Sequence, residues 1–260
     1  MTPLAEARAL VVARGKCTVL HGVDLTVGLG EAVAIVGPNA AGKTTLLQSL
    51  AGLLPSAEGA VLLKGKPVGD WKRDALARVV ALVGAEEGTP SPLTVEDRVR
   101  LGRYPHRGPF RPLTSEDGAA VERAIRLARV ESLAHRRLDT LSAGERQLAA
   151  LARGLAQEPE LLLLDEPAAH LDVRHQLHVF RILQDVRARG VAIVAIVHDL
   201  QRAADWADRM ILVASGRIAA EGRPSEVLSS KACSEALRVA IRSHAFPGRA
   251  EPLYSFEEVL

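Results

Sequence analysis

Runs of apolar residues alternate with amphipathic segments along this chain, and their lengths predict alternating strands and helices. Apolar runs within 33–37, 160–167 and 191–199 are short enough to be strands buried on both faces. Leucines at helical spacing predict a helix over 43–54. Apolar spacing also predicts a strand over 61–66, a helix that runs into a strand over 73–84, and helices over 119–130, 145–157 and 173–190. Thr94, three residues ahead of Asp97, has the spacing of a helix cap.

This alternation is typical of an α/β protein with a mostly parallel sheet and flanking helices. Residues 86–157 are mostly helical and interrupt it, so we expect a helical subdomain inserted into a core made of residues 1–85 and 158–223. Within the insertion, 103–118 is rich in Pro, Gly and charge and is predicted to be a loop. The stretch 224–260 is less regular and is expected to be an appended tail.

Composition and charge narrow the class of protein. The 260 residues are 48% apolar with a net charge of +2, and 27 of the 33 basic residues are arginines spread along the chain among acids. This spread argues against a nucleic-acid partner. Two distant cysteines, Cys17 and Cys233, favour a reducing compartment. The N-terminus has no signal-peptide core, and the longest apolar run, 191–197, is too short for a bilayer. We expect a soluble protein whose membrane role, if it has one, comes through a partner.

A phosphate-binding loop is the clearest chemical signal. GPNAAGKT, residues 37–44, fits G-x-x-x-x-G-K-[ST] between a predicted strand and a predicted helix. Gly37 and Gly42 let backbone N–H groups turn toward phosphates, and Lys43 would reach the β- and γ-phosphate oxygens. Thr44 could ligate Mg²⁺. The expected nucleotide-binding residues here are Gly37, Pro38, Asn39, Ala40, Ala41, Gly42, Lys43, Thr44 and Thr45.

Acidic and imidazole side chains end two of the apolar strands. Adjacent carboxylates at the end of LLLLDEP, 161–167, are costly without a cation or a reaction to serve. Asp165 is expected to hold Mg²⁺, and Glu166 to polarise the attacking water as general base. His198 ends the next apolar strand, and ligands of such sheets lie at the strands' carboxyl ends. We favour a γ-phosphate contact for His198 over a purely structural role.

LSAGERQ, residues 141–147, has two interpretations. Ser142 and Glu145 fit S-x-x-E, a capping box that only begins a helix. That interpretation leaves Gly144 and the order Leu-Ser-small-Gly unexplained. The alternative is a second anion cradle at the helix N-terminus.

Together these four elements, in this order, resemble the ATP-binding cassette (ABC) ATPases over residues 4–230. The resemblance implies a P-loop NTPase core with an N-terminal β-subdomain and an inserted helical subdomain. It implies a head-to-tail homodimer in which Ser142, Ala143, Gly144 and Glu145 contact the ATP held by the partner copy. It also places Asp172 at the dimer contact.

Two positions depart from the family pattern. Arg14 stands where the family usually has an aromatic residue that stacks on adenine, and a guanidinium plane can also stack on a base. Ala85, followed by Glu86, stands where the family has a glutamine that senses Mg²⁺ and the transporter. This change affects the expected coupling and turnover but not nucleotide binding. His170, His175 and His178 are expected to be structural, with a zinc site a distant alternative.

The segments 70–107, 222–231 and 238–256 resemble those of the importers that take up iron–siderophore, haem or cobalamin. We therefore expect an importer ATPase at the cytoplasmic face of the cell membrane, with two membrane-spanning permease subunits and an external substrate-binding protein. The alternatives are the ATPase of an ABC exporter and a soluble ABC ATPase. The soluble class is disfavoured because the chain has no sustained heptads and room for only one cassette.

Overall fold

The computed structural model describes all residues except 1, 85–90, 109–110, 247, 249–251 and 259–260. The chain divides into two compact units. Unit 1 is made of residues 1–69 and 194–260, and unit 2 of residues 70–193.

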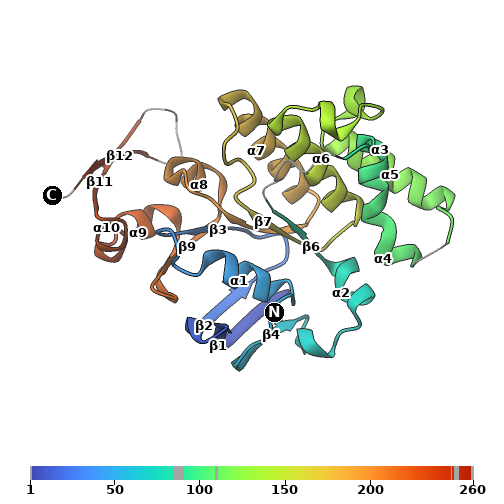
Figure 1. Ribbon diagram of the computed structural model, residues 1–260. Coiled ribbons are helices and arrows are strands. Elements are labelled where there is room, and N and C mark those ends of the chain that lie inside the picture. The colour runs from blue at the N-terminus through green and yellow to red at the C-terminus, as the bar shows by residue number, and fades with distance from the viewer. Residues whose placement is uncertain (1, 85–90, 109–110, 247, 249–251, 259–260) are drawn as a thin grey trace. The chain divides into compact units, whose positions relative to one another are not determined.

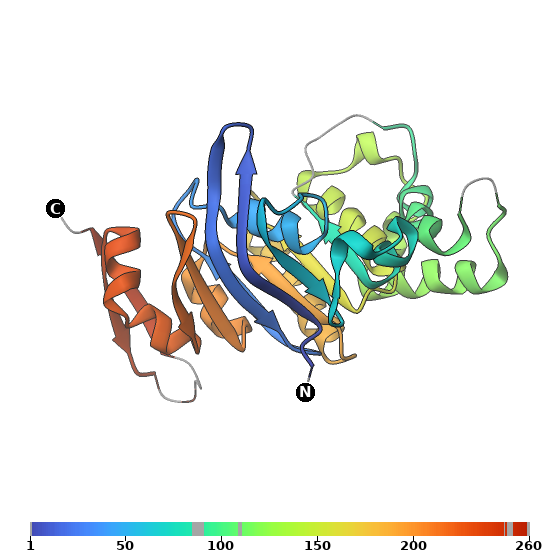
Figure 2. The same ribbon diagram turned by 90° about the horizontal axis from the view of Figure 1, so that it is seen from below.

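Unit 1 begins with an antiparallel sheet in the order β2-β1-β4-β5. Its two long strands form the hairpin drawn in blue in Figure 2, and several register shifts interrupt their pairing. A second group of strands pairs β9 parallel to β3 and antiparallel to β10. The bounds of these elements are β1 Ala5–Arg14, β2 Cys17–Val27, β3 Ala32–Val36, α1 Lys43–Leu50, β4 Glu58–Leu63, β5 Lys66–Pro67, β9 Arg209–Ala214 and β10 Arg217–Gly222.

Two of the expected elements in unit 1 end earlier than predicted. The helix expected over 43–54 stops at Leu50, because the Gly52 N–H donates to Ser49 O and the Leu53 N–H to Gln48 O. These two bonds, with Gly52 at φ 70°, form a Schellman stop. The strand expected over 61–66 is the end of β4 and the start of β5, joined by a tight turn with positive φ at residues 64 and 65.

The C-terminal part of unit 1 is more regular than the expected tail. It contains α8 Leu200–Trp206, α9 Pro224–Leu228, α10 Lys231–Leu237 and a hairpin of β11 Val239–His244 with β12 Leu253–Glu258. The hairpin is tied to α8, since the Tyr254 N–H donates to Gln201 Oε1 at 2.8 Å and the Gln201 amide donates to Pro252 O at 3.2 Å.

Unit 2 contains a parallel pair of strands, β6 and β7, and the helices α2 to α7, drawn from teal through green to gold in Figure 1. The expected capping box at Thr94 is confirmed. The prediction of a loop over 103–118 is wrong at both ends, because this segment contains the short helix α4 and the start of α5. A second capping box, Thr114 with Asp117, begins α5 earlier than expected. The bounds are α2 Arg73–Val79, β6 Val80–Val83, α3 Val95–Arg100, α4 Tyr104–Arg107, α5 Ser115–Leu127, α6 Ala143–Ala156, β7 Leu161–Asp165 and α7 Val173–Arg187.

The continuously apolar strands are buried, as predicted. Every residue of β3 and of β8, Ala192–Ile196, is buried, and so are the four leucines of β7. The apolar run 191–197 is thus a core strand, and no helix in the described part of the chain is long and apolar enough to cross a bilayer.

A buried arginine joins three segments of unit 2. Arg103 is 3% exposed and donates to Asp117 at 2.9 Å, to Ala156 O at 2.8 Å and to Glu158 at 2.8 Å. Burial alone would raise the pKa of Asp117, but the hydrogen bonds from Thr114 and Arg103 outweigh it and lower this pKa to about 2. The carboxylate therefore stays ionised at neutral pH and holds α5 to Arg103 and, through it, to the end of α6.

We expect Arg103→Met to lower the free energy of unfolding by about 3–5 kcal/mol, because it leaves the buried Asp117 carboxylate without its charged partner. Urea denaturation followed by circular dichroism measures this change. Arg126→Met is the matched control, since Arg126 is 58% exposed and pairs with Glu122 at 3.5 Å; its cost should stay within about 1 kcal/mol. An equal loss of unfolding free energy in the two variants would contradict the conclusion that the buried ion pair of Arg103 stabilises unit 2.

Candidate functional site

The loop after β3 brings backbone closer to its neighbours than any side chain would permit. A Cβ on Gly37, at φ 143°, would lie 2.0 Å from Val213 O. A Cβ on Gly42, at φ 104°, would lie 2.9 Å from Leu20 Cδ2. Ala40 also adopts a left-handed conformation, at φ 59°. The two glycines predicted from the sequence are thus required both by conformation and by space.

Lys43 lies over this loop at the first position of α1. Its side chain is almost fully buried, and Nζ donates to Gly37 O and Pro38 O at 2.8 Å each. Gly42, the N-cap of α1, has no side-chain oxygen to offer the first-turn N–H groups. A helix start of this kind presents backbone donors and a positive dipole end, which together bind phosphate.

Arg14 ends β1 and is exposed, and its guanidinium donates to the amide of Gln48 on α1. The hydrogen bond holds Arg14 beside the helix whose first residues follow the phosphate loop. The residue that faces Arg14 across the hairpin is Cys17, at the start of β2.

The two cysteine thiols differ strongly in environment. Cys17 is exposed, whereas Cys233 is buried in α10. Burial raises the pKa of the Cys233 thiol to about 11, which keeps it in the unreactive protonated form.

His198 follows β8 and is exposed. The preceding Val197 N–H donates to Ile35 O at 3.1 Å, so the end of β8 runs beside the end of β3, from which the phosphate loop leaves. The next residue, Asp199, caps α8 through the Arg202 N–H. His198 therefore lies at a strand end, beside the end of the strand from which the phosphate loop leaves.

In unit 2, Asp165 is the last residue of β7 and Glu166 follows it, and both are half-buried. Glu166 has φ 52°, and its carbonyl accepts from the Ala169 N–H at 3.1 Å. A left-handed glutamate is strained, and such strain gathers at functional positions. The carboxylate of Asp165, and in unit 1 the hydroxyl of Thr44, are each oxygen donors of the type that Mg²⁺ prefers, so each side chain by itself fits that ion chemically.

The segment 141–147 forms the capping box that its sequence allows. Ser142 Oγ accepts from the Glu145 N–H at 3.2 Å, and Glu145 Oε2 accepts from the Ser142 N–H at 2.7 Å. The hydrogen bond from the Ser142 backbone is the main reason that the pKa of Glu145 is lowered. Further along α6, the Gln147 amide donates to Gly84 O at 3.5 Å and ties the helix to the end of β6.

The capping box does not explain why residue 144 is glycine, but the packing of the His175 ring does. A Cβ at this position would lie 2.6 Å from two carbons of the His175 ring on α7. The sequence analysis did not connect these residues, because they lie on different helices and no local pattern relates them. Ala143, the first residue of α6, lies between Gly144 and the cap residue Ser142.

Asp172 is the N-cap of α7. Its carboxylate accepts from the His175 N–H at 2.8 Å and from His175 Nδ1 at 2.9 Å, and the pKa of Asp172 is lowered by these two hydrogen bonds. His170 precedes this cap in a left-handed turn. The pKa of His178 is lowered by burial and by neighbouring arginines, Arg129 first among them. In the part of the chain that the structure describes, no group of three His, Cys, Asp or Glu residues is placed to hold a metal.

The expected substitution at the glutamine position, Ala85 with Glu86, lies outside the described residues. The last described residue before it is Gly84, the acceptor for Gln147.

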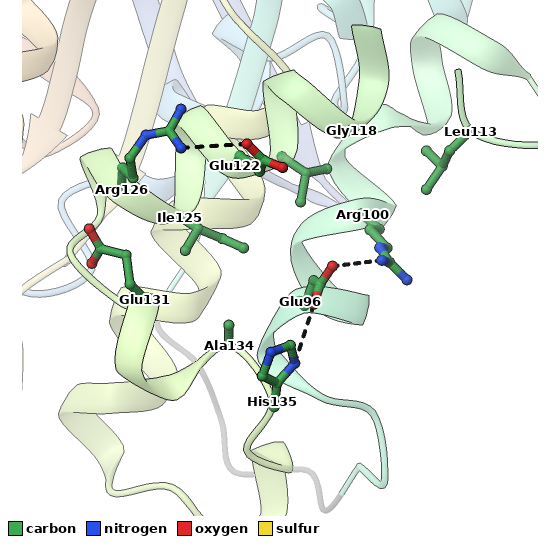
Figure 3. Close-up of a pocket in the computed structure, with 11 residues that line it drawn as sticks. Glu96, Arg100, Leu113, Gly118, Glu122, Ile125, Arg126, Glu131, Ala134 and His135 are labelled. Carbon is green, nitrogen blue, oxygen red and sulfur yellow. Dashed lines mark hydrogen bonds and ion pairs between the residues drawn. The ribbon is translucent and has the colours of Figure 1, made fainter. Parts of the chain in front are cut away.

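Unit 2 also has a surface groove of about 440 Å³, which runs between α3, α5 and residues 131–135 (Figure 3). Glu96 lies at its rim between Arg100, at 2.6 Å, and His135, at 3.4 Å. Glu122 pairs with Arg126, also on the rim. None of the described residues that line the groove is among the predicted site residues.

The sequence profile of a family described as ABC transporter matches residues 20–169. The match covers more than half of the chain and includes the phosphate loop, the capped α6 and β7. The chain belongs to the ABC transporter family.

Curated ABC transporter proteins are similar over most of their length. The chain is 48% identical over 232 residues to the hemin import ATP-binding protein HmuV of Streptomyces coelicolor, which covers 89% of this chain and 82% of the relative. It is 37% identical over 223 residues to the ferric enterobactin transport ATP-binding protein FepC of Escherichia coli, covering 85% and 82%.

Solved structures of ABC transporters share the fold. An inward-facing putative metal-chelate type ABC transporter matches with a TM-score of 0.84 at 22% identity, over 98% of this chain and 96% of that chain. A dimeric, post-hydrolysis ATP-binding cassette with ADP and Pi matches with a TM-score of 0.73 at 25% identity, over 85% and 98%. The predicted fold class, a P-loop NTPase core with flanking helices, is confirmed.

We expect Arg14→Ala to weaken ATP binding by roughly 0.5–2 kcal/mol if the guanidinium stacks on adenine. Calorimetric titration with ATP measures the change. Arg8→Ala is the control, because Arg8 is on the same strand, is 62% exposed and pairs with Glu6. An unchanged affinity in Arg14→Ala would return Arg14 to the role of a surface residue.

Proposed function

We propose that this chain is the ATP-hydrolysing subunit of an ABC importer that takes up an iron chelate, either haem or a ferric siderophore. The family match and the 48% identity to a hemin import ATP-binding protein, over 89% of the chain, carry this proposal. The similarity to a ferric enterobactin subunit supports the wider class of iron chelates. Cobalamin, the third cargo that the sequence resemblance implies, is an outcome that the test can still return.

ATP binds to the loop between β3 and α1. The backbone of residues 37–42 and the first turn of α1, with Thr44 and Thr45, surround the phosphates, while Lys43 moves its ammonium from the loop carbonyls to the β- and γ-phosphate oxygens. Arg14, held beside α1 by Gln48, stacks on the adenine.

Thr44 and Asp165 would hold the Mg²⁺ that accompanies the nucleotide. When bound, it neutralises charge that develops on the phosphate oxygens. Glu166 accepts the proton of the attacking water, and the left-handed backbone at this residue aims its carboxylate. His198 and Lys43 stabilise the γ-phosphate in the transition state.

Two copies form the working unit. The N-terminus of α6, from Ser142 to Glu145, acts as an anion ligand for the ATP of the other copy, and Asp172 lies at the contact between copies. Dimeric cassettes exist among the solved structures that share this fold. Closure and reopening of the dimer would move the helical subdomain, residues 86–157, against a pair of membrane-spanning permease subunits.

The chain works at the cytoplasmic face of the cell membrane, bound to these permease subunits and served by an external substrate-binding protein. The ATP-binding core is formed by residues 1–85 and 158–223, and the segment 224–260 is an addition to it. Because Ala85 has no ligand atom and Glu86 adds negative charge, coupling to the permease differs from that of relatives with a glutamine there.

Glu166→Gln should retain ATP binding, lose turnover by about 10²–10⁴-fold because the general base is gone, and accumulate as a dimer with ATP. Light scattering gives the mass, and phosphate release gives the rate. Glu131→Gln, an exposed carboxylate in the same unit, should leave both unchanged. A Glu166→Gln chain that stays monomeric with ATP would remove the trans role of Ser142 to Glu145.

The importer itself is tested by a tagged pull-down from detergent-solubilised native membranes, with a tag-only strain as control. We expect a many-spanning membrane protein in about equal amount, because the proposed complex pairs each copy with one permease subunit. The recovered complex is then assayed for ATP hydrolysis with binding protein loaded with haem, a ferric siderophore or cobalamin. A chain found wholly in the soluble fraction would favour a soluble ABC ATPase, and a partner without importer features would favour an exporter.

A further inference from the structure

His175, on the first turn of α7, touches two segments that the proposed function places against a second copy. Its Nδ1 is 2.9 Å from both carboxylate oxygens of Asp172. Its ring lies so close to Gly144 that a Cβ there would be 2.6 Å from two ring carbons. One side chain thus joins the start of α7 to the start of α6.

The contact with Asp172 fixes the hydrogen on the ring. A carboxylate can only accept, so Nδ1 carries the hydrogen and donates it. The backbone N–H of His175 donates to the same carboxylate at 2.8 Å. Asp172 is 65% exposed, yet two donors from one residue determine how its carboxylate is oriented.

The contact with Gly144 joins the His175 ring to the start of α6. The His175 ring is 25% exposed and packs on the backbone of the first turn of α6, where a Cβ at position 144 would lie 2.6 Å from two ring carbons. The neighbouring Glu145 closes the cap on Ser142. The ring therefore supports the turn that holds the whole segment 142–145.

We propose that His175 is a positioning residue that holds residues 142–145 and Asp172 in one fixed arrangement, which a second copy meets as a single surface. The proposal rests on the proposed function, because only the head-to-tail dimer makes that surface useful. It identifies the residue that holds the two contact segments in a fixed position relative to each other. It also explains why residue 144 is glycine, which the capping box does not.

Three substitutions separate the two contacts. His175→Phe keeps the ring on Gly144 and removes the hydrogen bond. His175→Asn keeps an N–H donor near the position of Nδ1 and removes the ring. His175→Ala removes both, and His178→Ala, one turn later on α7, is the matched control.

The link itself is measured on the full chain by amide hydrogen exchange, without any second copy. His175→Ala should speed exchange at Glu145 and Arg146, in the first turn of α6, by about tenfold or more, because that turn loses its support. The amides of α5 and the whole His178→Ala variant should exchange as in the parent chain. Unchanged exchange at the start of α6 in His175→Ala would overturn the proposal.

The consequence for assembly is measured in the Glu166→Gln chain with ATP. His175→Ala should raise the protein concentration at half-dimerisation by about tenfold, while the ATP affinity of the monomer stays the same. His175→Asn and His175→Phe should each recover part of the loss, which a general packing defect would not produce. Dimerisation of His175→Ala at the parent concentration would overturn the proposal. If the Glu166→Gln parent itself fails to dimerise, the proposed function fails, and the exchange experiment still decides whether His175 links the two helices.

Discussion

Nucleotide binding in this chain depends on how closely the backbone of residues 37–44 can pass its neighbours. Phosphate oxygens are held by main-chain N–H groups, which must converge from several residues at once, so side chains cannot stand between them. At Gly37 and Gly42 the space for a Cβ is already filled by Val213 O and by Leu20. The buried strand β3 sets the position of the loop's first residue, and α1 fixes its end. The apolar core of unit 1 therefore determines the shape of the phosphate loop.

In unit 2, side chains rather than close backbone packing position the helices, above all α6. Arg103 holds Asp117, Ala156 O and Glu158 together, so that α5 and the end of α6 are fixed by charge within an apolar bundle. The start of α6 is set differently, by its cap and by the ring of His175 on Gly144. A helix fixed at both ends by separate devices can present its N-terminus in a constant orientation. That property suits a segment whose proposed ligand belongs to another molecule.

Local sequence patterns predicted what local interactions determine. The buried strands, the capping boxes at Thr94 and Ser142, and the phosphate loop all follow from spacing within a few residues. The stop of α1 was missed, because leucines at helical spacing continue past Leu50 while the Gly52 turn ends the helix. The start of α5 was missed, although Thr114 and Asp117 carry a visible signal, because the surrounding Pro and Gly favoured a loop. The contact of His175 with Gly144 joins distant helices, so no periodicity could indicate it.

The two thiols of this chain differ enough in exposure for one of them to be labelled selectively. Thiolate is the reactive form, and the buried Cys233, with its pKa raised to about 11, supplies almost none at neutral pH. Cys17 is exposed and faces Arg14 across the β1–β2 hairpin. A thiol-reactive fluorophore added to the unmodified chain would therefore attach beside the side chain proposed to stack on adenine. Its emission would follow the arrival and departure of nucleotide, with no residue of the chain replaced.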